Sequence, residues 1–328
     1  MNTQLEQYIQ VRNLAGAWLR TEVAMISVEG PDRFTWLQGM LSNDMRLLAS
    51  GSTGRLPACI LDATGHVLAD VQVTALPNSE SAMLEVPTAQ QPDLLELLDR
   101  YIIMEDVSLS ASDLAVVTLQ GPGAESLLQA ATQSGLSEYH AFPADHTGSG
   151  GFDLCADRGE AIGLLDALVQ AGAATVNETL AELLRIEAGI PLYGKELDRS
   201  VIALEAGFGS SHISSTKGCY VGQEIIARIM SRGHTNRILG GLVLTQGGVA
   251  EIQPGARLYA ANDGNKENNG LRETGRITSI ATSAPSAGGK PIALAYLRHE
   301  HSNPGQELIV GEQANATAVV QALPFYHA

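Results

Sequence analysis

The chain has 328 residues, 45% of them apolar, and carries a formal net charge of −16. This length exceeds what one hydrophobic core usually serves, so we expect two or three domains. A strongly negative chain without a Lys/Arg stripe is a poor partner for nucleic acid. No apolar run approaches the roughly 18 residues needed to cross a bilayer, and we expect a soluble, monomeric protein of the cytoplasm.

One strand-to-helix pattern occurs twice in the first two thirds of the chain. A strand over residues 23–28 leads through Gly-Pro into a helix around 34–38, and a strand over 115–119 leads through Gly-Pro into a helix around 127–129. Proline suits the first turn of a helix because its missing N–H would be unpaired there anyway. Because the Gly-Pro pair stands at the same place in both strand-helix units, we favour a duplication of these units over chance similarity.

Further strands and helices follow the same interleaved order. A hairpin is predicted from residues 58–61 and 66–74, joined by the turn sequence Asp-Ala-Thr-Gly. A second strand-helix pattern also occurs twice. Its first copy has a strand at 83–86 and a helix at 94–98, and its second copy has a strand at 152–155 and a helix at 164–169. The pattern predicts an α+β fold with two ferredoxin-like units, residues 1–110 and 111–236.

The character of the chain changes at Arg237. Short strands separated by Gly-, Asn- and Ser-rich turns are predicted at 237–244, 256–260, 275–282, 291–297, 306–310 and 316–323. Strands at such spacing indicate a sandwich or a small barrel over residues 237–328. The polar loop at 262–269 is predicted to be mobile.

Three cysteines, Cys59, Cys155 and Cys219, are too few and too scattered for a disulfide framework or a zinc site. They fit a reducing compartment, and one chain cannot supply four thiolates to an iron–sulfur cluster from them. The histidines show no ligand spacing, and the Gly-rich segments lack a nucleotide-binding fingerprint. The sequence therefore predicts no metal site.

The most informative segment is the octet Lys217, Gly218, Cys219, Tyr220, Val221, Gly222, Gln223 and Glu224, which precedes isoleucines at helical spacing. Cys219 is thus predicted just before a helix N-terminus. The helix dipole and the Lys217 ammonium both favour thiolate over thiol, which suits a reactive cysteine. The alternative is a small buried residue in a tight turn, with no chemical role.

The octet resembles the K-G-C-Y-x-G-Q-E motif of the YgfZ-type folate-binding proteins. These are relatives of the glycine-cleavage T-protein, an aminomethyltransferase, and act in iron–sulfur cluster assembly or repair. The upstream run at 184–194, Leu-Arg-Ile-Glu-Ala-Gly-Ile-Pro-Leu-Tyr-Gly, resembles the T-protein pattern L-R-x-E-A-G-x-x-L-Y-G, and weaker similarity runs nearly end to end. The resemblance implies a T-protein-like fold that ends in a β-barrel, and tetrahydrofolate as the ligand.

Glu187 is one candidate ligand residue, because it interrupts an apolar segment where a charge is costly unless paired. A carboxylate can accept the parallel N–H donors of a pterin edge. The alternative is a surface glutamate paired with Arg185 or Lys195. The resemblance implies that the glutamate matching Glu187 contacts the pterin.

Asp70 is the second candidate. Residues 65–73 resemble the T-protein segment G-G-x-x-D-D-x-x-V, whose aspartate lies beside the folate nitrogens that carry the one-carbon unit. As a general acid or base Asp70 could exchange a proton during C–N bond formation. Ala69 replaces the first aspartate of the pair, which puts catalysis in doubt more than folate binding. The alternative is a solvated aspartate on the polar face of a strand.

Further assignments follow from the same resemblance. Tyr193 matches a pocket-lining tyrosine, or is a core tyrosine. Arg237 matches the arginine that opens the last T-protein domain and reaches the ligand, or is a surface residue of the linker. Glu224 and Arg228 are predicted to form a surface pair on the helix. Gln223 either caps that helix or orients the cysteine loop.

Three functions stay open. The first is a tetrahydrofolate-binding accessory protein for iron–sulfur assembly or repair that uses Cys219 and meets client or assembly proteins. The second is an aminomethyltransferase; the T-protein motif there resembles K-x-x-F-x-G, so Cys219 is an addition that this chemistry does not need. The third is a scaffold with a vestigial pocket. We favour the first, and a polyglutamylated folate would need local cations that the sequence does not identify.

Overall fold

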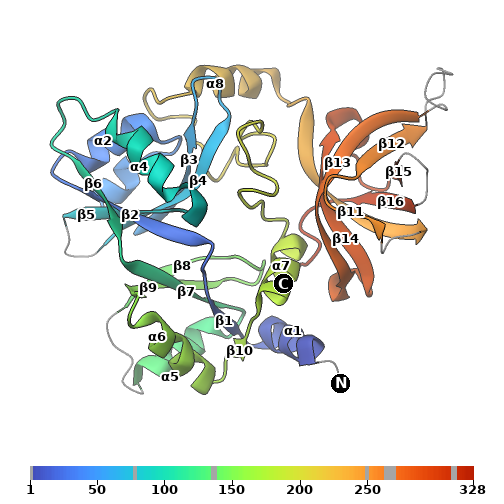
Figure 1. The fold of residues 1–328 in the computed structure, drawn as a ribbon, viewed down its shortest axis with the longest axis horizontal. Helices are drawn as coiled ribbons and strands as arrows, with labels where there is room; N and C mark the ends of the chain where they lie inside the picture. Colours follow the sequence, from blue (N-terminus) through green and yellow to red (C-terminus); the bar gives the residue numbers. More distant parts are fainter. Residues whose placement is uncertain (1–2, 77–79, 134–138, 248–250, 262–270, 312–315) are drawn as a thin grey trace.

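A computed structural model describes residues 3–76, 80–133, 139–247, 251–261, 271–311 and 316–328. Figure 1 shows two α+β units on one side of the molecule and a β-barrel on the other. The loop predicted at 262–269 lies outside the described residues. No helix in the described part of the chain has the length and apolar character that crossing a membrane requires.

The first α+β unit is built on a sheet in the order β3-β4-β5-β2-β6. Its strands are β2 (Val23–Glu29), β3 (Arg55–Leu61), β4 (Val67–Ala75), β5 (Ser81–Pro87) and β6 (Ser108–Ser112). One core contains apolar residues of this sheet and of α2 (Arg33–Met40), α3 (Arg46–Ala49) and α4 (Gln91–Asp99), which follows the 3₁₀ turn η1 (Thr88–Gln90). Strands β3 and β4 form the predicted hairpin. Burial alternates along β4, so that Asp70 points away from this core.

The second unit is built on a sheet in the order β10-β1-β7-β9-β8. Its strands are β1 (Gly16–Leu19), β7 (Leu114–Gln120), β8 (His140–Pro143), β9 (Gly151–Asp157) and β10 (Ala174–Thr175). Helices α5 (Ala124–Gln133) and α6 (Ala161–Gln170) share the core of this sheet, whereas the apolar residues of α1 (Thr3–Asn13) and α7 (Glu178–Ala188) lie in another core together with barrel residues. The sequence groups β1 with residues 1–110, but its backbone pairs with β7 and β10, so the N-terminus crosses into the second unit.

The glycines of the two Gly-Pro pairs, Gly30 and Gly121, are required by the backbone. Gly30 and Gly121 both have positive φ, at 111° and 134°, where β2 and β7 turn toward α2 and α5. A Cβ at Gly30 would lie 2.1 Å from the carbonyl oxygen of Asp106, and one at Gly121 would lie 2.6 Å from that of Leu14. Neither position can accept a side chain without moving backbone.

The C-terminal domain is a closed barrel in the order β11-β14-β13-β12-β15-β16. Its strands are β11 (Arg237–Gly247), β12 (Arg257–Ala261), β13 (Leu271–Ala284), β14 (Lys290–Arg298), β15 (Glu307–Val310) and β16 (Ala316–Gln321), with 3₁₀ turns η4 (Pro285–Ala287) and η5 (His299–His301). All six predicted strands are confirmed. Pairing of β11 with β16 closes the sheet, which decides for a barrel rather than a sandwich.

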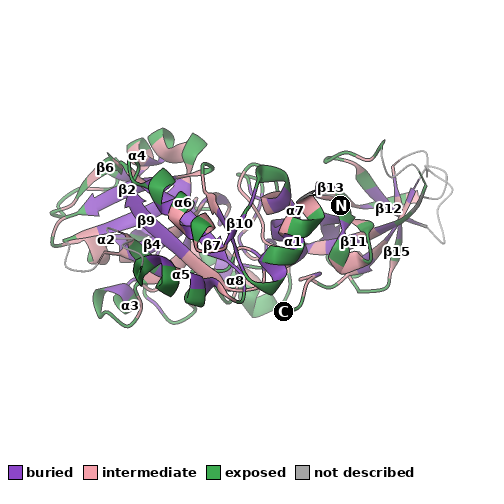
Figure 2. Ribbon diagram, turned by 90° about the horizontal axis from the view of Figure 1, so that it is seen from below, coloured by how far each residue is buried: buried purple, intermediate pink, exposed green. Residues whose placement is uncertain are grey.

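Residues 189–222 connect α7 to α8 (Gln223–Arg232) with little regular structure and pass between the first unit and the barrel (Figure 1). A hydrophobic core forms around this segment from all three parts: Tyr8 and Val11 of α1, Cys59 and Leu61 of β3, and Leu294 and Tyr296 of β14. Figure 2 shows that the strands are largely buried and that the helices keep exposed faces. The junction of the three parts is therefore packed through residues 189–222.

Candidate functional site

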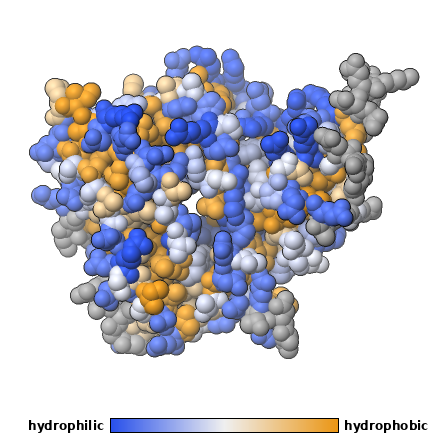
Figure 3. Space-filling view, in the orientation of Figure 1, coloured by the Kyte–Doolittle hydropathy of each residue, from blue (hydrophilic) through white to orange (hydrophobic). Residues whose placement is uncertain are grey.

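A cavity of about 940 Å³ lies at this junction. Its lining comes from β1, β4, β5, α7 and the segment after α7, with Trp18, Tyr193 and Phe208 as its aromatic residues. Figure 3 shows the face hollowed near its centre, between the α+β units and the barrel. Ligand sites in proteins usually measure roughly 300–1,000 Å³ and combine apolar walls with a few polar groups. The cavity has both the size and the composition for a small organic ligand.

Asp70 projects into this cavity from the middle of β4. Its side chain is 28% exposed, and its Oδ1 lies 3.1 Å from His212 Nε2. Oδ1 is itself buried and accepts no well-aligned hydrogen bond from the described residues, so His212 makes a close polar contact with it rather than an aligned hydrogen bond. The exposed part of the Asp70 side chain, which excludes Oδ1, offers acceptor capacity that a ligand could use.

Tyr193 also lines the cavity, because α7 ends at Gly189 in the left-handed conformation and the chain turns along the wall. The structure thus brings Asp70 and Tyr193 together from positions 123 residues apart in the sequence. His212 and Phe208 complete this wall, although no spacing or motif in the sequence singles them out.

Glu187 lies on the other face of α7. The residues of this helix that line the cavity recur at helical spacing and include Glu178, Glu182 and Arg185. Glu187, two positions beyond Arg185, is rotated by about 200° around the helix axis. It is fully buried, accepts hydrogen bonds from Arg12 Nη2 at 2.5 Å and Tyr8 Oη at 3.2 Å, and does not line the cavity.

Arg237 at the start of β11 does not line the cavity either. Its Nε lies 2.9 Å from Glu205 Oε2, its Nη2 donates to the carbonyl of Ser200 at 2.7 Å, and its guanidinium lies over the ring of Tyr296. These contacts fasten the segment after α7 to the barrel.

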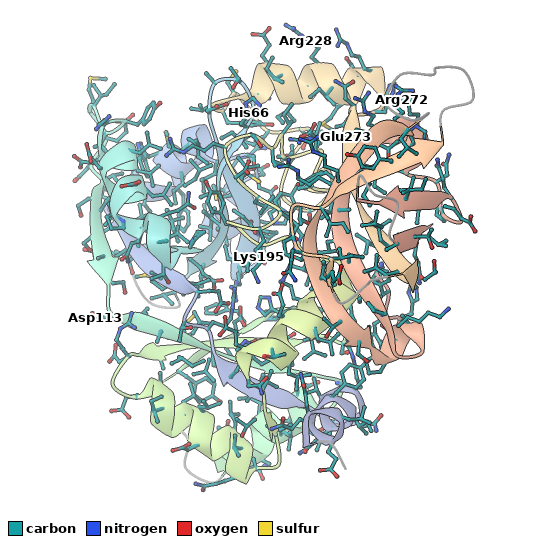
Figure 4. All side chains as sticks on the ribbon, turned by 45° about the vertical axis from the view of Figure 1, so that its right-hand side comes forward. His66, Asp113, Lys195, Arg228, Arg272 and Glu273 are labelled. Atoms are coloured by element: carbon teal, nitrogen blue, oxygen red, sulfur yellow. The ribbon has the colours of Figure 1, made fainter. Side chains whose placement is uncertain are left out.

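Two cations at the cavity wall share one carboxylate. Arg185 donates two hydrogen bonds to Glu182, and the Nζ of Lys195, which is labelled in Figure 4, lies 2.9 Å from Glu182 Oε1. Arg185 also pairs with buried Glu196 at 2.8 Å. Arg185 and Lys195 thus pair with Glu182 and Glu196, not with Glu187.

A cluster of charges joins the two sheets at the cavity. Arg20 and Arg55 each pair with both Glu85 and Asp153, at distances of 2.6–3.3 Å, and His146 Nε2 lies 2.9 Å from Asp153 Oδ2. Burial by itself disfavours ionised Asp153, but the surrounding cations hold its pKa well below the usual range. No motif in the sequence marks this cluster, and its signal there is one carboxylate in each of two apolar strands, Glu85 in β5 and Asp153 in β9.

The chain matches two family models, the GCVT N-terminal domain over residues 2–144 and the glycine cleavage T-protein C-terminal barrel domain over residues 237–327. It is 30% identical over 333 residues to the aminomethyltransferase of Rubrobacter xylanophilus, covering 96% of this chain and 84% of that relative. The chain belongs to the glycine-cleavage T-protein, or aminomethyltransferase-like, superfamily.

Other relatives agree. The aminomethyltransferase of Geobacillus thermodenitrificans is 28% identical to this superfamily member, over 98% of this chain and 89% of the relative. The crystal structure of glycine cleavage system aminomethyltransferase T from Bartonella henselae superposes with a TM-score of 0.83, over 98% of this chain and 89% of that chain. At 22% identity that likeness concerns the fold.

In this T-protein relative, Lys217 of the octet binds backbone carbonyl groups. Its Nζ donates to the carbonyl oxygens of Gln38, Leu41 and Asn43 at 2.5–2.9 Å, at the C-terminal end of α2. Burial lowers the pKa of Lys217 to about 8, although nearby Asp44 opposes the shift. Because the ammonium is surrounded by these carbonyls, its hydrogen bonds are not available to Cys219.

The end of the octet attaches α8 to the β3–β4 hairpin. Gly222 precedes the helix with φ +84°, and a Cβ there would lie 2.5 Å from the carbonyl oxygen of Asp62. No side chain caps this helix end, so Gln223 begins the helix without a capping bond. Glu224 and Arg228 form the predicted surface pair at 2.6 Å, and Arg228 points outward in Figure 4.

Cys219 is exposed and lies outside the cavity lining, whereas Cys59 and Cys155 are buried. Burial raises the pKa of Cys155 to about 12. We therefore expect iodoacetamide to alkylate Cys219 first in the native protein near pH 7.5, because accessible thiols react and buried ones are inert. Peptide mass mapping after short exposure would measure this, and faster labelling of Cys59 or Cys155 would contradict it.

Proposed function

We propose that this T-protein superfamily member binds a tetrahydrofolate in the cavity, with the pterin N–H donors facing Asp70. One observation carries the proposal: an incompletely hydrogen-bonded carboxylate projects into an aromatic-walled cavity of suitable volume. A carboxylate accepts a parallel pair of N–H donors in a fork. Trp18 and Tyr193, which line the cavity and are partly exposed, supply flat apolar surfaces for the ring.

In this proposal, different residues of the chain contact different parts of the folate. The bound folate supplies a nitrogen that can carry a one-carbon unit. Asp70 orients the pterin and can exchange a proton with it. Arg185 and Lys195 are cations for the glutamate tail, which must compete for them with Glu182. Glu187 and Arg237, which do not line the cavity, support the wall from outside.

For the biological role we propose an accessory protein in iron–sulfur cluster assembly or repair. The support is the octet with an exposed Cys219 and the replacement of one T-protein aspartate by Ala69. Since Cys219 lies outside the cavity lining, its thiol is proposed to act on a client protein or its cluster, as substrate, rather than on the pterin.

Aminomethyl transfer is the second candidate. The name aminomethyltransferase is carried by the relatives that match nearly the whole chain, and this observation favours transfer over the accessory role. Asp70 in the cavity is compatible with that chemistry. The octet and Ala69 are the features that favour the accessory role.

Folate binding is tested by isothermal titration of the native protein with 5-formyltetrahydrofolate. We expect saturable binding, and a loss of about 1.5–3 kcal/mol in the Asp70→Ala variant, because a charge-assisted hydrogen bond disappears. Asp113→Ala is the matched control, since Asp113 is exposed and lies far from the cavity (Figure 4). No heat up to millimolar ligand, or equal affinity of the Asp70 variant, would reject the proposal.

The two roles are separated by a transfer assay and a complementation assay. We expect little methylenetetrahydrofolate from an aminomethyl-lipoyl carrier protein. In a deletion strain, the Cys219→Ala variant should fold and bind folate but fail to restore iron–sulfur enzyme activity. Robust transfer by the native protein, or full rescue by the variant, would favour the transferase.

A further inference from the structure

We infer that His212 is the positioning residue of this cavity, the group that orients the Asp70 carboxylate for the ligand. The inference rests on the proposed folate site and adds a residue to it. His212 belongs to no motif of the octet or of residues 184–194, and its sequence context, Ser-Ser-His-Ile-Ser-Ser, has no ligand spacing. Its placement in the structure carries the argument.

Both ring nitrogens of His212 are engaged. Nε2 lies 3.1 Å from Asp70 Oδ1, and Nδ1 lies 2.7 Å from the hydroxyl oxygen of Ser211. The ring is stacked on Phe208, with centroids 3.9 Å apart and an interplanar angle of 23°. The three side chains His212, Phe208 and Ser211 all line the cavity with Asp70. The imidazole ring is therefore held by Phe208 and Ser211, with Nε2 beside the Asp70 carboxylate.

The backbone of His212 is tied to the strand beside Asp70. Ser42 Oγ donates to the carbonyl of His212 at 2.6 Å and accepts from the backbone N–H of Cys59 at 2.8 Å. Cys59 is the β3 residue opposite Asp70 in the β3–β4 register. The Ser42 hydroxyl thus links the backbone of His212 to the β3–β4 strand pair that carries Asp70.

This arrangement accepts either charge state of the imidazole. With a proton on Nε2, the ring places that N–H beside Asp70 Oδ1, off the axis of a good hydrogen bond, and Nδ1 accepts from the Ser211 hydroxyl. If Nδ1 also carries a proton, it donates to the same hydroxyl oxygen. In both states an N–H of His212 lies beside Asp70 Oδ1 without an aligned hydrogen bond, and the carboxylate keeps lone pairs that a ligand could use. Asp70 therefore contacts the ligand in this proposal, and His212 positions Asp70.

Two variants separate positioning from packing. His212→Phe keeps an aromatic ring against Phe208 and removes both nitrogens, whereas His212→Gln removes the ring and keeps an N–H donor near Asp70. We expect His212→Phe to weaken 5-formyltetrahydrofolate binding about tenfold, because a polar group beside the Asp70 carboxylate is lost, and His212→Gln to retain most of the native affinity. His140→Gln, an exposed histidine on β8, is the control.

The outcomes of this titration differ for the two proposals. Rescue by glutamine, with similar melting temperatures for both His212 variants, supports positioning. Native affinity in His212→Phe, or equal losses in both variants, overturns the role of His212 and leaves folate binding standing. Absence of binding by the native protein overturns the folate site itself, and the positioning role falls with it.

Discussion

Replacing Glu187 by alanine is expected to lower the free energy of unfolding by about 3–5 kcal/mol, because it leaves the buried Arg12 guanidinium without its carboxylate. Arg12 has only 6% of its side chain exposed, and Glu187 has none. The Arg12 guanidinium also stacks on Tyr326, 3.5 Å from the ring centroid, near the C-terminus. The carbonyl of Glu187 accepts from the backbone N–H groups of Phe325 and Tyr326. One residue of α7 therefore joins the first helix to the end of the chain.

Denaturant titration monitored by circular dichroism measures this loss. Glu178→Ala on the exposed first turn of the same helix is the control, and it should change stability by less than about 1 kcal/mol. Unchanged stability of Glu187→Ala together with lost folate affinity would mean that Glu187 serves the ligand directly.

Asp153→Asn is expected to cost about as much, 3–5 kcal/mol, since it leaves two buried arginines with one carboxylate fewer. Asp153 on β9 is fully buried, and its partners Arg20 and Arg55 are 10% and 7% exposed. Arg55 belongs to β3, so the change weakens the contact between the two sheets beside the cavity. Asp157→Asn, at the exposed end of β9, is the control.

The same carboxylate predicts a pH dependence. The folded state depresses the pKa of Asp153, so its stabilisation is present above the unfolded pKa of about 4 and is lost as pH falls toward the folded value. Chemical denaturation at pH 7 and pH 3 measures this difference. The gap between native protein and Asp153→Asn should narrow at pH 3, and a gap of constant size would contradict the assignment.

The parts of the fold that depend on local patterns were predictable. Six barrel strands and the β3–β4 hairpin follow from alternation and turn residues close together in the chain. The placement of β1 could not be predicted from local patterns, because its partner strands β7 and β10 lie more than 90 residues away in the sequence. Short strands carry too little pattern to identify distant partners.

The site was predictable only in part, for the same reason. A carboxylate in an apolar segment indicates that Glu187 needs a partner, but that partner is Arg12, 175 residues away. Proximity in sequence suggested that Lys217 acts on Cys219, whereas its ammonium binds carbonyls at the end of α2. The pairing of Asp70 with His212 likewise arises only when residues 189–222 fold against β4.

The most direct test is the structure of the protein with 5-formyltetrahydrofolate bound. Our account predicts the pterin in the cavity, its N–H donors within hydrogen-bond distance of Asp70, and the Glu187–Arg12 pair intact. A pterin bound elsewhere, or one that takes Glu187 away from Arg12, would contradict it.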